Sequence, residues 1–203
     1  MKYSKIQNKG FTLIELLVVI MIIVVLMGIL VPVVNKGMAK AQKTKALNTC
    51  TQLVTAVDSY YNTYNILPAN SKSAPTEDTE VDSTEPIMSV LVGINVDNMN
   101  RKEQSFFSGE EAKGSSKSSA RGGLFRDSTS AELYDPWKKK ASEQRGYLML
   151  LDYGYDEKLD DPIRPGRVLG KRVVTWSTGK DGEWSRGKKN SKVNQDNVYS
   201  WMN

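Results

Sequence analysis

The chain opens with a long apolar run, residues 11–34. Its sequence, FTLIELLVVIMIIVVLMGILVPVV, holds 20 apolar residues among 24, and Glu15 is its single charged residue. As a helix, this run would be about 36 Å long, which is enough to cross a hydrocarbon core of about 30 Å. It is too long for the apolar core of an ordinary secretory signal peptide, and no A-x-A site follows it. The pattern therefore predicts a membrane-spanning helix.

Beyond Pro32 the pattern changes from wholly apolar to amphipathic. Apolar and aromatic residues recur every three or four positions, as on one face of a helix; they are Leu47, Cys50, Val54, Val57, Tyr61 and Tyr64. Pro68 marks the end of this periodic stretch. We predict one helix from about Thr12 to Tyr64, whose second half covers a globular head with Cys50 in its core.

Strand patterns dominate the last third of the chain. The runs GYLMLLDY at 146–153 and RVVTWS at 172–177 are β-rich and are bounded by Gly, Pro and Asp. We expect a short antiparallel sheet to pack on the helix and to bury Leu47, Val54 and Val57. This arrangement gives an α+β fold.

The middle of the chain, residues 68–130, is expected to be a variable loop region. Residues 68–86 are acidic with few apolar positions, and residues 101–123 are rich in Ser, Gly, Lys and Glu. Between them, residues 87–96 could form a short helix or strand on the head. Phe106 and Phe107 are expected to pin the second polar stretch to the head.

Composition excludes several kinds of chemistry. The 203 residues include no His and a single Cys, which rules out Ser-His-Asp and Cys-His catalytic units, His-containing zinc sites and internal disulfides. We predict that the chain is not an enzyme. The net charge of +5 is weak evidence for nucleic acid, and DNA or RNA binding is not expected. Only a few cations could form a basic face, namely Arg172, Lys180, Arg186, Lys188, Lys189 and Lys192.

The start of the chain resembles a known family. The first ten residues, MKYSKIQNKG, hold three lysines and no acid, so this end should remain cytoplasmic and the rest should lie outside. Lys9-Gly10 followed by FTLIELLVVI resembles the class III leader of type IV pilins and type II secretion pseudopilins. The resemblance implies that prepilin peptidase cuts between Gly10 and Phe11, and that the new Phe11 amine is methylated.

The same resemblance gives roles to Glu15 and Pro32. Glu15 falls on the family's acidic position, and Pro32 matches its helix-breaking proline, a place where the helix partly unwinds as the subunit leaves the bilayer. A carboxylate at this depth in a membrane costs about 2.5–3.5 kcal/mol on insertion scales, so it requires a partner. Pairing Glu15 with the Phe11 ammonium of a neighbouring subunit would neutralise both charges and set the register of assembly.

Two C-terminal motifs resemble secretion pseudopilins in particular. Tyr134-Asp135-Pro136-Trp137 is similar to the D-P-W motif of the major pseudopilin. The tail frame S-x-G-x-D-G, followed by D-N-V-x-S-W, is similar to that family's calcium-binding loop. Asp181, Glu183 and Asp196 are the candidate Ca²⁺ ligands, since calcium prefers six to eight oxygens.

The tail also permits a reading without metal. Four cations, which would repel calcium, lie in this loop: Arg186, Lys188, Lys189 and Lys192. In the alternative, the loop is closed by its own hydrogen bonds and Trp201 is tucked back under the helix. Both alternatives stay open at this stage.

Together these features predict a pilin-like α+β fold in five segments. They are a leader at 1–10, a transmembrane and filament-core helix at 11–34, an amphipathic helix at 35–67, loops at 68–130, and a C-terminal sheet and loop at 131–203. The resemblance implies a structural subunit of a type II secretion pseudopilus, single-pass in the inner membrane with its head in the periplasm. Its partners would be prepilin peptidase, further copies, other pseudopilins and the inner-membrane secretion platform. The alternatives are a type IV pilin for adhesion or motility and a DNA-uptake pseudopilin.

Overall fold

The computed structural model describes residues 11–71, 73–84, 86–137 and 146–202. The chain divides into two compact units, residues 1–41 and 42–203. Helix α1, Leu13–Tyr64, contributes to both units. Within the described residues it is the one helix that is long and apolar enough to cross a membrane. The predicted helix from about Thr12 to Tyr64 is thereby confirmed in its extent.

The second unit is built around a four-stranded antiparallel sheet. Its strand order is β1-β4-β7-β8. The strands are β1, Thr79–Asp82; β4, Leu148–Leu151; β7, Val173–Ser177; and β8, Val198–Tyr199. The two runs identified as strands in the sequence, 146–153 and 172–177, thus supply the central pair β4 and β7.

Both faces of this sheet are buried, because successive side chains of a strand point to opposite faces. Met149 and Leu151 of β4 join the core that contains the head part of α1, whereas Leu150 belongs to a second apolar cluster with Val174 and Trp176. The second cluster contains no residue of α1. The sheet therefore separates a helix-side core from a core formed with the C-terminal loops.

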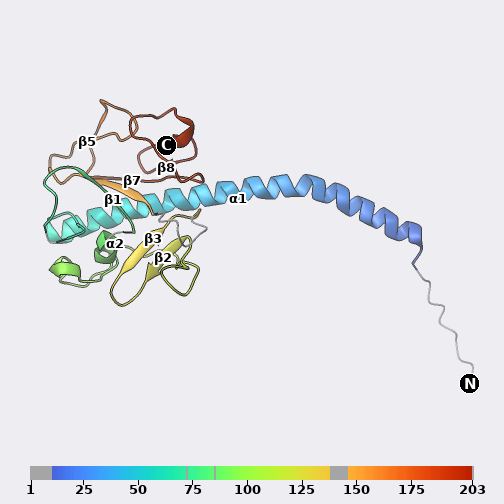
Figure 1. Cartoon of the computed structure of the whole chain (residues 1–203), viewed down its shortest axis with the longest axis horizontal. Coiled ribbons are helices and arrows are strands. Elements are labelled where there is room, and N and C mark those ends of the chain that lie inside the picture. Colours follow the sequence, from blue (N-terminus) through green and yellow to red (C-terminus); the bar gives the residue numbers. More distant parts are fainter. Residues whose placement is uncertain (1–10, 72, 85, 138–145, 203) are drawn as a thin grey trace, which may run out of the picture. The chain divides into compact units, whose positions relative to one another are not determined.

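A second group of elements packs on the helix-side core. It consists of α2, Pro86–Leu91, and the hairpin of β2, Gly123–Arg126, with β3, Ala131–Tyr134. Figure 1 draws α2, β2 and β3 on one side of the head part of α1, and β1, β7 and β8 on the other. Short 3₁₀ turns lie at η1, Val96–Asn98, and η2, Lys192–Asn194. The small hairpin of β5, Leu159–Asp160, and β6, Val168–Leu169, belongs to the second cluster through Leu159 and Leu169.

The buried face of α1 is shifted from the predicted stripe. The fully buried residues of this face are Ala46, Cys50, Leu53, Ala56, Val57 and Tyr60. Cys50 and Val57 are buried as expected, but Val54 is only half-buried and Leu47 is 37% exposed. Because Ala46 and Ala56 have small side chains, the other elements of the head can pack close to this face of the helix. They therefore cover this face and not the one with the bulkier residues.

The region expected to be loops, residues 68–130, contains several regular elements. It supplies β1 at the edge of the main sheet, α2, η1 and β2. Phe107 is buried and Phe106 packs edge-on against Tyr60, with ring centroids 5.3 Å apart. The backbone N–H groups of Phe106 and Phe107 both donate to Leu91 O, so these residues do pin the segment to the head.

The predicted fold class is confirmed. A long N-terminal helix packs against a small antiparallel sheet, as an α+β pilin-like fold requires. The Y-D-P-W segment follows β3 directly, and Trp137 is buried in the helix-side core. Residues 1–10, with Gly10 of the predicted leader, lie outside the described residues.

Candidate functional site

The first turn of α1 is held by a reciprocal hydrogen-bond pair between Thr12 and Glu15. Glu15 Oε2 accepts the Thr12 backbone N–H at 2.8 Å and the Thr12 hydroxyl at 2.7 Å. The Glu15 backbone N–H in turn donates to Thr12 Oγ1 at 3.3 Å. This is a capping box, in which residues three apart satisfy the free N–H groups of a helix start. Glu15 is therefore fixed at the helix start, next to Phe11.

The side chains of this first unit are uncovered. Every residue from Phe11 to Ala41 is exposed in the single chain, and Phe11 itself is 80% exposed. A continuous apolar surface of this size is unfavourable in water. It must be covered by lipid or by other helices.

Pro32 lies inside α1, which continues through it without interruption. Because proline has no backbone N–H, the carbonyl of Gly28 four residues earlier loses its usual helical donor. Gly28 also has nothing within 4 Å of the position that a Cβ would take. The pair is a weak point in an otherwise regular helix, and its partial unwinding during assembly stays a prediction.

The tail loop between β7 and β8 is closed by Asp196. Its Oδ2 accepts the backbone N–H of Lys180 at 2.5 Å and that of Asp181 at 3.1 Å. Gly179 makes this possible, because its φ is +68° and a Cβ there would lie 2.7 Å from the Asp196 carboxyl carbon. Asp181 Oδ1 accepts the N–H of Glu183 at 2.9 Å. The two ends of the loop are thus joined by hydrogen bonds.

This arrangement brings Asp181 and Asp196 together, but their carboxylates bind backbone N–H groups. Across the described part of the chain, no three His, Cys, Asp or Glu side chains are grouped so as to hold a metal ion. The calcium site at Asp181, Glu183 and Asp196 stays a prediction that no observation here tests.

Trp201 does not pack under the helix as the alternative reading expected. It lies in the second cluster, with its ring centroid 5.8 Å from Trp176 and 5.1 Å from Tyr199. Both of those side chains are on the sheet face that points away from the helix-side core. The chain end therefore covers the outer face of the sheet.

The Y-D-P-W segment joins the hairpin to the main sheet. Asp135 is fully buried; its Oδ1 accepts the Trp137 N–H at 3.1 Å and its Oδ2 accepts the Ser177 hydroxyl at 3.3 Å. Asp135 therefore turns the chain after β3 and ties it to the end of β7. Its role in this structure is in the fold of the head.

Two of the six cations considered for a basic face are paired with acids. Arg172 lies 3.4 Å from Asp58 and 2.8 Å from Glu157, and Arg186 lies 3.2 Å from Glu80. Arg172 also covers the ring of Tyr61 at 4.0 Å. These two residues thus act in packing the head.

Thr12 is a residue that the sequence analysis did not single out. The signal for it was present, since T-x-x-E at residues 12–15 before an apolar run is the capping-box pattern. Ser83, whose hydroxyl bonds both Leu133 O and the N–H of Tyr147, carries no comparable signal because these partners are 50 and 64 positions away in the sequence.

Comparisons with known proteins agree with the resemblance at the N-terminus. The family described as Prokaryotic N-terminal methylation motif matches residues 6–31, a range that includes Gly10, Phe11 and Glu15. The fimbrial protein EcpC of Eikenella corrodens is 39% identical over 67 residues, which are 33% of this chain. Those residues are 44% of EcpC, so the match spans less than half the length of this curated relative. No solved structure gives a significant match.

These findings support a type IV pilin-like protein. The matched family is named for methylation at the N-terminus, and helix α1 is long and apolar enough to cross a membrane.

Proposed function

We propose that this chain is a structural subunit of a type II secretion pseudopilus. Prepilin peptidase cuts it between Gly10 and Phe11, and it polymerises through its N-terminal helix into a short filament that moves folded proteins outward. The proposal rests on one observation above all: the exposed apolar segment of α1 carries a single charge, Glu15, at its first turn. The D-P-W and S-W frames of the C-terminal half support the secretion assignment over other pilin-like roles.

In this proposal, the exposed apolar segment is covered by different surroundings before and after assembly. Before assembly the bilayer covers residues 11–34, and in the filament the same residues of neighbouring subunits cover one another. Cleavage after Gly10 creates a positive amine on Phe11, four residues before Glu15. A Glu15 carboxylate of one subunit paired with the Phe11 amine of the next leaves no net charge in the apolar core.

A fimbrial subunit is the second candidate. It is favoured by the 39% identity to a fimbrial protein over the 67 aligned residues. The two candidates share processing and assembly through α1, and they differ in whether the filament remains in the cell envelope or extends from the cell.

Intact-protein mass spectrometry of the chain extracted from native membranes tests the shared part. We expect a chain that begins at Phe11 and carries one additional methyl group. A chain that still begins at Met1, in cells with active prepilin peptidase, would leave a membrane-anchored domain and contradict the filament role.

A deletion strain separates the two candidates. Loss of the gene should abolish the release of secreted proteins into the medium while long surface filaments persist. If surface filaments disappear and secretion continues, the chain is a fimbrial subunit. Complementation with the unaltered chain should restore whichever function is lost.

A further inference from the structure

Two lysines follow the apolar run of α1 almost directly. Lys36 is the first charged residue after Glu15, and Lys40 comes about one helical turn later. Residues four apart lie on the same face of a helix, so the two side chains are neighbours. Both residues are exposed, and both belong to the first unit, residues 1–41. The end of the apolar run therefore carries a small basic surface.

No described carboxylate neutralises this surface. Residues 16–57 contain no Asp and no Glu, so the surrounding part of the helix offers no acid. Neither lysine forms an ion pair with a described residue, whereas Lys45 in the head lies 2.7 Å from Glu110. Two like charges four residues apart destabilise an isolated helix. An anion from outside the chain would remove this repulsion.

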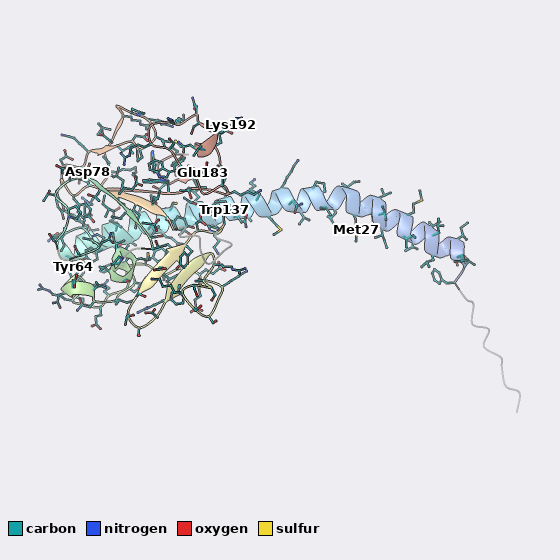
Figure 2. All side chains as sticks on the ribbon, in the orientation of Figure 1. Met27, Tyr64, Asp78, Trp137, Glu183 and Lys192 are labelled. Carbon is teal, nitrogen blue, oxygen red and sulfur yellow. The ribbon has the colours of Figure 1, made fainter. Side chains whose placement is uncertain are left out.

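The described residues of the first unit leave the two lysines uncovered. Gly37 follows Lys36 and has nothing within 4 Å of the position that a Cβ would take, and Met38 is 60% exposed. Figure 2 shows side chains of this unit, including the labelled Met27, extending outward on both sides of the ribbon. An approaching anion can therefore reach both ammonium groups.

The place of the lysines along α1 matches the headgroup layer of a bilayer. The hydrocarbon core is about 30 Å thick and the whole bilayer about 40–45 Å, which leaves about 5–8 Å for each headgroup layer. The apolar run of residues 11–34 is long enough to fill the core, so Lys36 is the first cation beyond it. Lys40 lies about 6 Å farther along the helix. In a spanning helix, both ammonium groups are thus within reach of lipid phosphates.

Lipid phosphate is the anion that this placement favours. A lysine ammonium has three N–H donors, and phosphate oxygens accept such charged hydrogen bonds well. Anionic lipids attract basic residues that adjoin a membrane span. A carboxylate would have to enter the same layer, and the described part of the first unit contains only Glu15, which lies at the other end of the apolar run.

We propose that Lys36 and Lys40 bind phosphate groups of anionic phospholipids, on the side of the membrane where the chain continues into the head. This inference rests on the membrane-spanning stage of the proposed function and adds a lipid partner to it. Cleavage after Gly10 removes the leader lysines, so these two residues are then the cations nearest the apolar run. The contact holds the subunit at a fixed depth, and it must be broken when the subunit leaves the bilayer for the filament.

The lipid selectivity of the full chain tests the proposal. The chain is reconstituted in phosphatidylcholine vesicles with a trace of spin-labelled phosphatidylglycerol or spin-labelled phosphatidylcholine. Electron spin resonance then measures the fraction of each labelled lipid that is bound to the protein. We expect a preference for phosphatidylglycerol that decreases in about 1 M salt, where the screening length falls to about 3 Å.

Paired substitutions assign this preference to the two lysines. Lys36→Gln with Lys40→Gln should lower it at least about fivefold, the effect of a single lysine at an anionic membrane surface. Lys36→Arg with Lys40→Arg retains both charges and should retain the preference. Lys158→Gln with Lys171→Gln, on exposed positions of the head, removes the same charge and should leave the preference unchanged. The leader is identical in all of these chains, so it cannot cause a difference between them.

The other outcomes contradict either this inference or the proposed function. The inference is wrong if the Lys36→Gln, Lys40→Gln chain keeps the preference, or if the head control loses it equally. It is also wrong if inorganic phosphate at matched ionic strength displaces the lipid, because the lysines then bind a soluble anion. Protease added outside intact vesicles tests the span itself. Digestion of residues 11–34 would show that the chain does not cross the bilayer, which contradicts the proposed function.

Discussion

At the scale of single residues, the core under the sheet holds a thiol that must stay neutral. Cys50 is fully buried, and its Sγ lies 4.0 Å from Val198 O. Burial raises the pKa of Cys50 from 9.0 to about 12. The folded state thus favours the protonated thiol, so its contribution to stability is complete below pH 9 and is lost as the pH rises towards 12.

We therefore expect the free energy of unfolding to fall by up to about 4 kcal/mol between pH 9 and 12 because of Cys50 alone. Urea unfolding in detergent measures this decrease in the free energy of unfolding. Tryptophan fluorescence can follow it, since all four tryptophans are in the head. Cys50→Ala should flatten this decline. A residual slope is expected from Tyr60, whose pKa is also raised to about 12 by burial. An unchanged decline in Cys50→Ala would contradict the assignment.

Asp196 is the second residue that determines a local structure. Asp196→Ala removes the acceptor of two backbone N–H groups and should lower the free energy of unfolding by about 1–3 kcal/mol. Asp196→Asn retains one oxygen and should cost less. If hydrogen bonds close the loop, Asp196→Ala should lower the free energy of unfolding equally in EDTA and in calcium. A decrease seen only with calcium would instead show that Asp196 binds the ion. Thermal melts of the three chains under both conditions make the comparison.

At the scale of elements, Ser83 connects the main sheet with the β2–β3 hairpin. Its hydroxyl donates to Leu133 O at 2.6 Å and accepts the N–H of Tyr147 at 2.7 Å. Its own backbone N–H and carbonyl bond the same two residues, donating to Tyr147 O and accepting from Leu133 N. A single fully buried residue thus links β3 with the residue that immediately precedes β4.

Ser83→Ala should therefore lower the free energy of unfolding by about 1–3 kcal/mol, because a buried donor and a buried acceptor lose their partner. Hydrogen exchange should increase at the Tyr147 amide, which loses its bond to the hydroxyl. Thr129→Ala, on an exposed turn whose hydroxyl bonds Asp127, is the control and should have a small effect. Equal losses from the two variants would contradict the connecting role of Ser83.

The elements that the sequence predicted are those marked by their own residues. Helix α1 and strands β4 and β7 each fall in an apolar, amphipathic or β-rich run, whereas β1 reads TEVD within an acidic stretch and turns only Val81 inward. Such a strand forms because β4 offers it an edge, and that pairing joins residues about seventy positions apart. The helix face was displaced for a related reason: 3.6-residue spacing fits Leu47 as well as Ala46, and only the packed sheet selects the smaller residue.

The candidate site shows the same contrast between residues that a local sequence pattern predicts and residues that only the fold brings together. The leader, Phe11 and Glu15 lie in one short segment, so a local pattern was enough to propose them, and the family match at residues 6–31 includes Phe11, Glu15 and the second half of the leader. The bond from Asp196 to Lys180 and Asp181, in contrast, depends on a tight glycine turn and on a loop that returns after sixteen residues. Carboxylate spacing alone could not distinguish this closure from a calcium loop.

At the scale of the whole molecule, the two units differ in how much of their apolar surface is exposed. The described residues 11–41 are exposed, whereas the head has its own two apolar clusters. In the described part of the chain, the Glu15 side chain accepts its hydrogen bonds from Thr12. Loss of Glu15 should accordingly leave the stability of the head unchanged and affect only what α1 does with other subunits.

Two substitutions separate the cap from the charge at this position. Glu15→Gln retains a side-chain oxygen that can accept from Thr12, as glutamine does in capping boxes, but it has no charge to offer the Phe11 ammonium of a neighbour. Glu15→Ala loses both. If the charge pair guides docking, both variants should lose at least about tenfold in sedimentable filaments, because the unpaired ammonium must then be buried alone. If Glu15→Gln assembles normally while Glu15→Ala does not, the cap is what assembly needs; urea unfolding of the head should be the same in all three chains.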